Sequence, residues 1–203
     1  MRVLIYGSRS FAATVADLAR HCGHDVVGMI DDMRPGPGIV GSLAQAAASF
    51  DPPAHGVLLG IGYNDLAARW AAWLRVRAAG FATPSLVHPR AYVADNARLG
   101  PGCLVMAHAI VDRCAQLGQA CVVWPGACVS HDTEVGSNTF LSPNATLCGA
   151  VRVGAHSFIG AAACVVDHGV VPEGGFVKMG SAYTQRAPVN PVKDDDGSGA
   201  KRR

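Results

Sequence analysis

Aliphatic residues recur at every sixth position through the second half of this chain. The sixteen positions from Val87 to Val177 taken at this interval are all Val, Leu or Ile. A period of six fits neither an α-helix nor an alternating strand, and it is typical of a stacked repeat in which each hexad repeats one piece of structure. The pattern therefore predicts a β-solenoid.

Two further positions of the hexad repeat as well. The residue two before each aliphatic is small almost throughout, as at Ala91, Ala97 and Cys103, and residues two apart in a strand share a face. The residue three after each aliphatic is Asn, Asp, Gly or His at eleven of the sixteen positions, and these types tolerate a positive φ best. Each hexad should therefore be a short strand with two inward side chains, followed by a corner.

A longer period predicts the shape of the solenoid. Leu-Gly or Val-Gly pairs recur at intervals of eighteen residues, at 99–100, 117–118, 135–136 and 153–154. Three hexads per coil predict a triangular prism, which at a strand spacing of about 4.8 Å would be roughly 25 Å long. Because such a prism has open ladder groups at its ends and flat faces, we expect a homotrimer.

Residues 1–85 follow a different pattern. Arg2–Gly7 predicts a buried strand, Ala12–Cys22 a helix and His24–Asp32 a second strand. This is a βαβ unit, so we expect a Rossmann-like α/β domain over residues 1–85, followed by an all-β solenoid over residues 86–188. Farther along the first domain, the sequence predicts a loop at Met33–Val40, a strand at Gly56–Gly62 and a helix at Asp65–Ala79.

The turn between the first strand and its helix is a candidate nucleotide site. Gly7, Ser8 and Ser10 occupy this turn, and Asp31 and Asp32 end the next strand. The two acids lie about 24 residues on, where a Rossmann-like unit places an acid that accepts hydrogen bonds from a ribose or a base. The alternative is that the two acids only end a strand.

Composition narrows the classes of partner. The net charge of +2 over 203 residues implies no particular partner, and the acidic and basic runs within residues 189–203 predict a disordered tail instead of a nucleic-acid arm. No apolar run reaches membrane-spanning length and Met1 leads directly into a strand, so we expect a cytoplasmic protein without a membrane partner. The seven cysteines form no CxxC pair, which favours reduced packing residues, with Cys103 and Cys121 on the inward track.

The repeat resembles that of the hexapeptide-repeat acyltransferases, whose units begin with an aliphatic residue and Gly and carry a small residue four positions on. Together with the βαβ unit, residues 1–188 resemble the sialic-acid O-acetyltransferase-like family of nucleotide-amino-sugar N-acetyltransferases. The resemblance implies a left-handed parallel β-helix, acetyl-CoA as cosubstrate, no metal, and a nucleotide-linked sugar held by the N-terminal domain. The first turn of this family is usually richer in glycine than it is here, where Arg9 and Phe11 stand.

One of the five histidines in or beside the repeat stands apart from the others. His131 lies two residues after Val129. The backbone conformation explains the presence of the other four, which lie on the corner track (His108, His156 and His168) or at the domain junction (His88). The resemblance implies that His131 is the general base of acyl transfer, a task that suits imidazole near pH 7, and that Asp132 orients it. Asp132 itself lies on the corner track, which gives a second reason for its presence.

Residues above and below His131 also fit a cosubstrate site. Gly149 follows His131 by eighteen residues and Arg113 precedes it by eighteen, so one corner of the prism stacks Arg, His and Gly. The missing side chain leaves room for a thioester, and the resemblance places Gly149 near the acyl group. It also implies an acetyl-CoA groove between subunits that is lined by Gly160, Ala161, Gly180 and Ser181.

Phe140 and several basic residues bear on the rest of the cosubstrate site. Phe140 stands where some relatives carry a second histidine, so the oxyanion donor would be a backbone N–H or water. Three basic residues lie near the end of the repeat: Lys178, Arg186 and Lys193. They could contact the cofactor phosphates, but ordinary surface charge is the favoured interpretation.

Several functions are compatible with these features. N-acetylation of a nucleotide-linked amino sugar fits best, and O-acetylation of a sugar, sialic acid included, would use the same base and cosubstrate. A γ-type carbonic anhydrase shares the prism but needs zinc histidines that include a His-x4-His pair, which this sequence lacks. The last alternative is a non-catalytic scaffold. The position of His131, off the corner track, argues against it, because a scaffold would have no chemical need for a histidine there.

Overall fold

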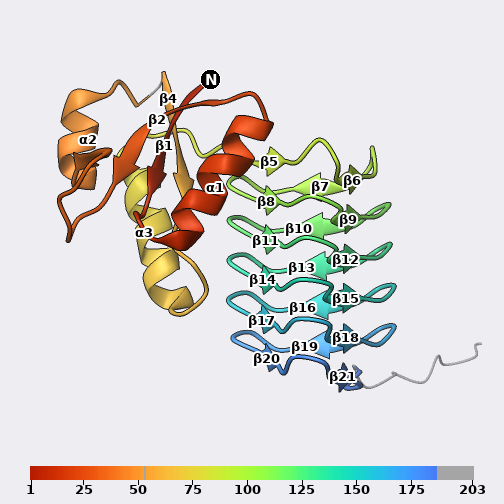
Figure 1. The fold of residues 1–203 in the computed structure, drawn as a ribbon. Helices are drawn as coiled ribbons and strands as arrows, with labels where there is room; N and C mark the ends of the chain where they lie inside the picture. Colours follow the sequence, from red (N-terminus) through yellow and green to blue (C-terminus); the bar gives the residue numbers. More distant parts are fainter. Residues whose placement is uncertain (53, 187–203) are drawn as a thin grey trace, which may run out of the picture.

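The computed structural model describes residues 1–52 and 54–186, and it consists of an α/β region beside a β-solenoid (Figure 1). The predicted tail over residues 189–203, including Lys193, lies outside the described residues. The helices and strands of the α/β region end at Ala78, and the first strand of the solenoid begins at Leu86.

The α/β region is built on one parallel sheet. Its four strands lie in the order β3-β2-β1-β4, with β1 (Arg2–Tyr6) between β2 (Asp25–Ile30) and β4 (His55–Leu59) and with β3 (Ile39–Gly41) at one edge. Helix α1 (Ser10–His21) connects β1 to β2, which confirms the predicted βαβ unit. Helix α3 (Leu66–Ala78) follows β4 and is capped by the Asp65 carboxylate.

Two short elements were not predicted from the sequence. Strand β3 begins inside the predicted loop, and α2 (Leu43–Ser49) occupies a stretch for which no element was expected. The helix starts at a capping box in which the Ser42 hydroxyl accepts from the Gln45 N–H and the Gln45 side chain accepts from the Ser42 N–H. A three-residue strand and a two-turn helix are too short to show a period, which is why the pattern did not reveal them.

The solenoid contains seventeen strands of two residues each. Their bounds follow the hexad repeat without interruption until the last strand: β5 (Leu86–Val87), β6 (Tyr92–Val93), β7 (Arg98–Leu99), β8 (Leu104–Val105), β9 (Ile110–Val111), β10 (Gln116–Leu117), β11 (Val122–Val123), β12 (Cys128–Val129), β13 (Glu134–Val135), β14 (Phe140–Leu141), β15 (Thr146–Leu147), β16 (Arg152–Val153), β17 (Phe158–Ile159), β18 (Cys164–Val165), β19 (Val170–Val171), β20 (Phe176–Val177) and β21 (Ala182–Tyr183).

These strands form three parallel sheets, one for each side of the prism. We name them face 1 (β5-β8-β11-β14-β17-β20), face 2 (β6-β9-β12-β15-β18-β21) and face 3 (β7-β10-β13-β16-β19). Each residue pairs with the one eighteen positions away, as Val129 does with Leu147 and with Val111. The predicted period of three hexads per coil is therefore confirmed.

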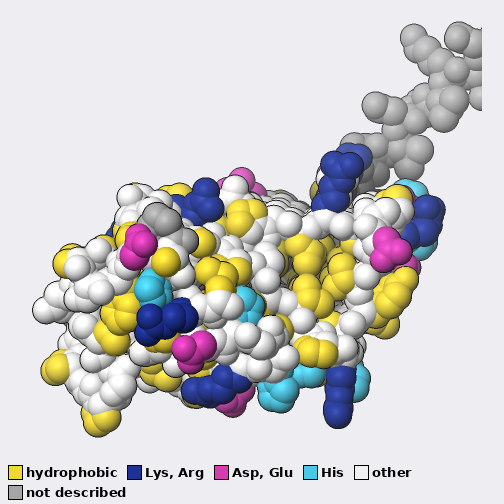
Figure 2. All heavy atoms as spheres, turned by 90° about the horizontal axis from the view of Figure 1, so that it is seen from above, with side chains coloured by type: hydrophobic (Ala, Val, Ile, Leu, Met, Phe, Trp, Pro, Cys, Tyr) yellow, Lys and Arg dark blue, Asp and Glu magenta, His cyan; other side chains and the backbone are white. Residues whose placement is uncertain are grey.

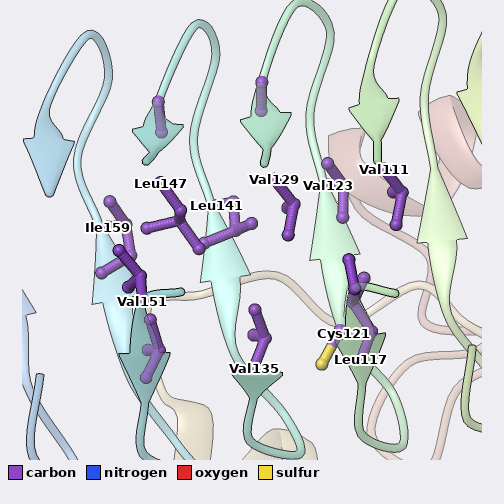
Figure 3. Close-up of a cluster of buried hydrophobic side chains, with 14 of the residues drawn as sticks. Val111, Leu117, Cys121, Val123, Val129, Val135, Leu141, Leu147, Val151 and Ile159 are labelled. Carbon is purple, nitrogen blue, oxygen red and sulfur yellow. The ribbon is translucent and has the colours of Figure 1, made fainter. Parts of the chain in front are cut away.

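The aliphatic track fills the interior of the prism. Figure 3 shows Val129, Leu141 and Ile159 pointing into a core that the small residues of the second track complete, and these three side chains are fully buried. Burial weakens at the first coil, where Val87 is 37% exposed because no coil lies above it. The view from above in Figure 2 shows hydrophobic side chains gathered on this end of the solenoid.

The corner track adopts the backbone conformation that its composition predicted. Ten non-glycine residues have a positive φ, and all of them lie three positions after an aliphatic residue: His108, Cys114, Ala120, Asp132, Asn138, Asn144, Ala150, His156, Ala162 and His168. The presence of Ala and Cys among them shows that the repeat imposes this conformation even on types that disfavour it. Cys103 and Cys121 are buried, as the sequence predicted, and all seven cysteines are free.

The α/β region packs against face 1 of the solenoid. Ala12, Val15 and Ala16 of α1 share one hydrophobic cluster with Leu104 and Val122, whose side chains come from β8 and β11. This packing leaves a cleft between the carboxyl end of the N-terminal sheet and the later coils of face 1. The position of that cleft determines where a ligand could contact both parts of the chain.

Candidate active site

The cleft between the two parts has a volume of about 1280 Å³ and takes its lining from both of them. The α/β region contributes every residue that the sequence proposed for nucleotide binding, namely Gly7, Ser8, Ser10, Asp31 and Asp32. The solenoid contributes Gly160 and Ala161 from the corner between faces 1 and 2. Residues from the two ends of the sequence therefore share one ligand-sized cavity.

Asp31 is held at the rim of this cleft by its neighbours. The Ser8 hydroxyl donates to one carboxylate oxygen of Asp31, and the backbone N–H groups of Met33 and Arg34 donate to the other, at 2.9 and 3.1 Å. The hydrogen bond from Ser8 is the main reason that the pKa of Asp31 lies below its usual value. Asp31 is thus an oriented carboxylate whose charge is kept at neutral pH.

Asp32 makes more internal contacts than the sequence suggested. The Tyr6 hydroxyl and the Arg75 guanidinium both donate to one of its oxygens, and the Leu43 N–H donates to the other at 2.9 Å. Burial alone would raise the pKa of Asp32, but the hydrogen bonds from Tyr6, Leu43 and Arg75 outweigh it and the pKa is lowered. Burial also raises the pKa of Tyr6, which keeps its hydroxyl a donor. Asp32 therefore organises this end of the cleft.

Aromatic rings form the solenoid wall of the cleft, and sequence reasoning did not identify them as a group. Phe140, Phe158 and Phe176 stack on successive coils of face 1, with ring centroids 6.0 and 5.4 Å apart. The ring of Tyr63, from the segment after β4, has its centroid 4.9 Å from the ring centroids of both Phe140 and Phe158. The signal in the sequence was Phe at an interval of eighteen in the outward position.

His131 lies at a different corner of the prism, between faces 2 and 3, directly after β12. Its Nδ1 is 2.8 Å from the Asp132 carboxylate, which also lies 3.4 Å from the Arg113 guanidinium of the previous coil. The hydrogen bond with His131, more than the charge of Arg113, lowers the pKa of Asp132. Asp132 has a φ of 58°, so it serves both the turn and the imidazole.

Gly149 lies against the other edge of this imidazole. A Cβ atom at residue 149 would be 2.7 Å from both Cε1 and Nε2 of His131, closer than any real Cβ contact. A side chain at residue 149 would therefore displace the imidazole from its position, and the stack of Arg113, His131 and Gly149 that the sequence indicated is present in the structure.

The arrangement suits proton transfer. An ionised Asp132 accepts the hydrogen of Nδ1, which leaves the lone pair of the imidazole on Nε2. The His131 side chain is 51% exposed, so Nε2 can be reached by a ligand. A neutral imidazole held by a carboxylate in this way can remove a proton from a nucleophile and later return it to a leaving group.

Replacing Gly149 with Ala is expected to lower kcat by about 100-fold, because the new Cβ displaces the imidazole and a shift of about 1 Å costs that much. Steady-state kinetics on a folded variant measure the effect. Gly36→Ala is the matched control, since a Cβ there meets only the end of the Ile39 side chain at 3.4 Å. An unchanged kcat for Gly149→Ala would show that the imidazole does not work in this position.

The residues proposed for the cosubstrate groove fall on two corners. Gly160, Ala161, Gly180 and Ser181 share the corner between faces 1 and 2, where the Gly180 N–H donates to the Ala161 carbonyl at 2.8 Å. Gly149 shares the corner of His131 and Asp132, which do not line the cleft. A single chain thus brings the nucleotide-binding candidates to the cleft with Gly160 and Ala161, and it places the candidate base on another corner of the prism.

Residues 1–52 and 54–186 contain neither a cluster of metal ligands nor a membrane-spanning helix. In this part of the chain no three His, Cys, Asp or Glu side chains come together as a metal site. Helices α1 to α3, the helices of the described residues, are all too short to cross a membrane.

Comparison with solved structures shows which proteins share this fold. The acetyltransferase domain of PglB from Neisseria gonorrhoeae superposes with a TM-score of 0.85 at 28% identity, covering 93% of each chain. PerB from Caulobacter crescentus, solved with CoA and GDP-perosamine, gives 0.84 at 28% identity over 93% of this chain and 91% of its own. These neighbours are acetyltransferases with the hexapeptide-repeat type of β-solenoid, the type that the sequence resembles. No family model and no curated protein matches the sequence.

A third relative extends the likeness of fold. WeeI from Acinetobacter baumannii is 19% identical to this chain and superposes with a TM-score of 0.78 over 94% of this chain and 95% of its own. The superpositions with PglB and PerB cover the α/β region and the solenoid together, since 93% of this chain exceeds the solenoid alone. The arrangement of a small α/β region beside a parallel β-solenoid is thus shared with these solved structures.

Proposed function

We propose that this chain is an acetyl-CoA-dependent N-acetyltransferase that acts on the amino group of a nucleotide-linked amino sugar. The observation that carries the proposal is the His131–Asp132 pair, which presents Nε2 over the bare backbone of Gly149. The solved relatives supply the substrate classes, because the PglB domain was solved with acetyl coenzyme A and PerB with CoA and GDP-perosamine.

The cleft is the proposed site of the nucleotide. The N–H groups at the start of α1 follow Gly7 and Ser8, and a helix N-terminus of this kind binds phosphate. Asp31 stands at the end of β2, where a Rossmann-like unit contacts the ribose, and its orientation by Ser8 suits that role. Ser10 is the first residue of α1 and would contact the diphosphate.

A homotrimer would complete the active site. The cleft and His131 lie on the two corners that bound face 2, so a neighbouring subunit packed on face 2 can bring its own His131 to this cleft. The outward side chains of face 2 fit such packing: Tyr92 is 58% and Ile110 40% exposed, and Cys128 and Cys164 are half-buried. Acetyl-CoA would then lie between subunits, along Gly160, Ala161, Gly180 and Ser181.

The transfer itself needs one base and one oxyanion donor. The amine nitrogen attacks the thioester carbonyl, its proton passes to Nε2 of His131, and the C–S bond breaks as the sulfur leaves and takes up that proton. Among the described residues the N–H of Gly149 has no hydrogen-bond partner, which makes it the proposed donor to the oxyanion. Asp132 stabilises the imidazolium that forms between the two proton transfers.

A panel of nucleotide-linked 3-amino and 4-amino sugars, incubated with acetyl-CoA, tests the proposal by the release of free thiol. We expect acetylation of at least one amino sugar, and no reaction of the same compound after its amine is blocked. Reaction of a hydroxyl acceptor in place of every amine would instead support sugar O-acetylation. Absence of transfer to any acceptor, with acetyl-CoA still bound, would favour a scaffold.

A further inference from the structure

A second carboxylate faces His131 from the far side of Gly149. The position that a Cβ would take on Gly149 is 2.8 Å from Oδ1 of Asp167 and 2.7 Å from Nε2 of His131. Oδ1 of Asp167 and Nε2 of His131 can therefore be no farther apart than the sum of these two distances. A single ligand nitrogen can bridge such a gap with two hydrogen bonds of about 2.8 Å each. Asp167 lies thirty-six residues, or two coils, beyond His131.

Asp167 is oriented by its own histidine. Nδ1 of His168 lies 2.6 Å from Oδ2 of Asp167, so Oδ1 is the oxygen that remains turned toward Gly149. The corner thus carries two carboxylate–imidazole pairs in opposite order along the chain, His131–Asp132 and Asp167–His168, on either side of Gly149. The sequence predicted that His168 occupies a turn, and its φ of 57° confirms this. The turn requires only the backbone of His168, so its side chain is free for another role.

The charged and titratable groups around Asp167 are few. His168 bonds its carboxylate, the Arg186 Nε donates to its backbone carbonyl at 3.0 Å, and Cys148 lies close enough for the charge of Asp167 to raise the pKa of its thiol, after burial and Cys164. The Asp167 side chain is 55% exposed. Arg186 binds the backbone and not the carboxylate, so Oδ1 remains available for a ligand cation.

The proton count of N-acetylation calls for such a group. A primary amine with a pKa near 8, as an α-amino group has, is mostly an ammonium at pH 7. When an ammonium becomes an amide, two protons leave the nitrogen: one replaces the acyl group on the CoA sulfur, and the other must go to solvent. A hydroxyl acceptor loses only one. His131 serves one transfer, so an amine that binds as the ammonium needs a second group that binds the cation and accepts or passes on a proton.

We propose that Oδ1 of Asp167 binds the acceptor ammonium opposite Nε2 of His131 and selects an amine over a hydroxyl acceptor. His168 is a positioning residue that holds Asp167 in this orientation. The first proton leaves the ammonium through Asp167 and the exposed His168 to solvent. The second passes through His131 to the departing thiolate while the C–N bond forms and the C–S bond breaks. This inference rests on the proposed N-acetyltransferase function.

Asp167→Asn tests the inference with the amino-sugar nucleotide that reacts in the panel and with its hydroxyl analogue as a competitive inhibitor. We expect kcat/KM for the amine to fall about tenfold at pH 7, mainly through KM, and the Ki of the hydroxyl analogue to stay unchanged. The deficit should shrink toward pH 9, where the amine is increasingly neutral in solution and needs no carboxylate. His168→Asn, which suits a positive φ, should show the same pattern with a smaller loss.

Asp95→Asn is the matched control, because Asp95 has the same register two coils before His131 and is exposed. Equal losses for the amine and the hydroxyl analogue, a loss that does not depend on pH, or no loss at all would each overturn the inference while leaving the N-acetyltransferase proposal intact. If no amine reacts with the unmodified protein, the proposed function fails and the role of Asp167 fails with it.

Discussion

Replacing His131 with Ala is expected to lower kcat for acetyl transfer by about a thousandfold, within the range of 10² to 10⁴ typical of a general base. The variant loses the only imidazole whose Nε2 lies over Gly149, while Asp132 and the backbone of the corner keep their places. Binding of acetyl-CoA should change little, because the proposed groove residues are backbone and small side chains. Thiol release and isothermal titration measure the two quantities separately.

His108→Asn is the matched control for this prediction. His108 is also an exposed histidine on a corner of the prism, with a φ of 60°, and Asn tolerates that conformation. It lies at the corner between faces 1 and 2 but does not line the cleft, so its replacement should leave turnover unchanged. If His131→Ala and His108→Asn had the same activity as the unmodified protein, His131 would not be the base and the proposed mechanism would be wrong.

Replacing Arg69 with Ala is expected to destabilise the protein by about 3 kcal/mol, because it leaves buried acceptors without donors and opens a cavity. Arg69 lies on α3 and is wholly buried. Its guanidinium donates to the carbonyls of Ile61 and Ala120, at 3.0 and 2.7 Å, and to the Asn138 side chain at 2.5 Å. Ala120 and Asn138 belong to the solenoid, so these bonds join its corner to the α/β region.

The same network explains why Arg69 tolerates burial without an acidic partner. Burial lowers its pKa to about 10, which still leaves it charged at neutral pH. Asn138 also donates to the Leu66 carbonyl at 2.7 Å, so its amide is fixed by α3 from both sides. Removing the guanidinium should therefore loosen the packing that shapes the cleft.

Thermal unfolding measures this prediction. A loss of about 3 kcal/mol corresponds to a decrease in Tm of about 6 to 12 °C for a chain of this size. Arg77→Ala, on the same helix and exposed, is the control and should stay within about 0.5 kcal/mol of the unmodified protein. Equal Tm values for the two variants would mean that the bonds of Arg69 do not hold the two parts together.

Most of the solenoid could be predicted because its information is local and repeated. Each hexad places one aliphatic residue, one small residue and one corner residue, so a misfit at one position is outweighed by fifteen equivalents. The α/β region was predicted less completely. Its long strands and helices show clear periods, whereas β3 and α2 are too short to show one.

The candidate site divides in the same way. The register of His131 within the hexad, the acid beside it and the glycine one coil later can all be read by counting along the sequence. The contacts of Asp32 with Tyr6 and Arg75 could not, because they depend on how α3 packs beside the sheet. The repeat does place Asp167 in the register of His131, but it does not indicate which way either side chain turns.

The sequence by itself determined the prism, its three-hexad coil, its positive-φ corners and the singular position of His131, because an uninterrupted repeat stacks each coil on the next in the same register. The tertiary structure alone decided three other features. These are the cleft between the α/β region and face 1, the buried Arg69 that joins the two parts, and the approach of Asp167 to His131 over Gly149. The physical reason is that each of them depends on side chains that meet across tens of residues, and no local period encodes such meetings.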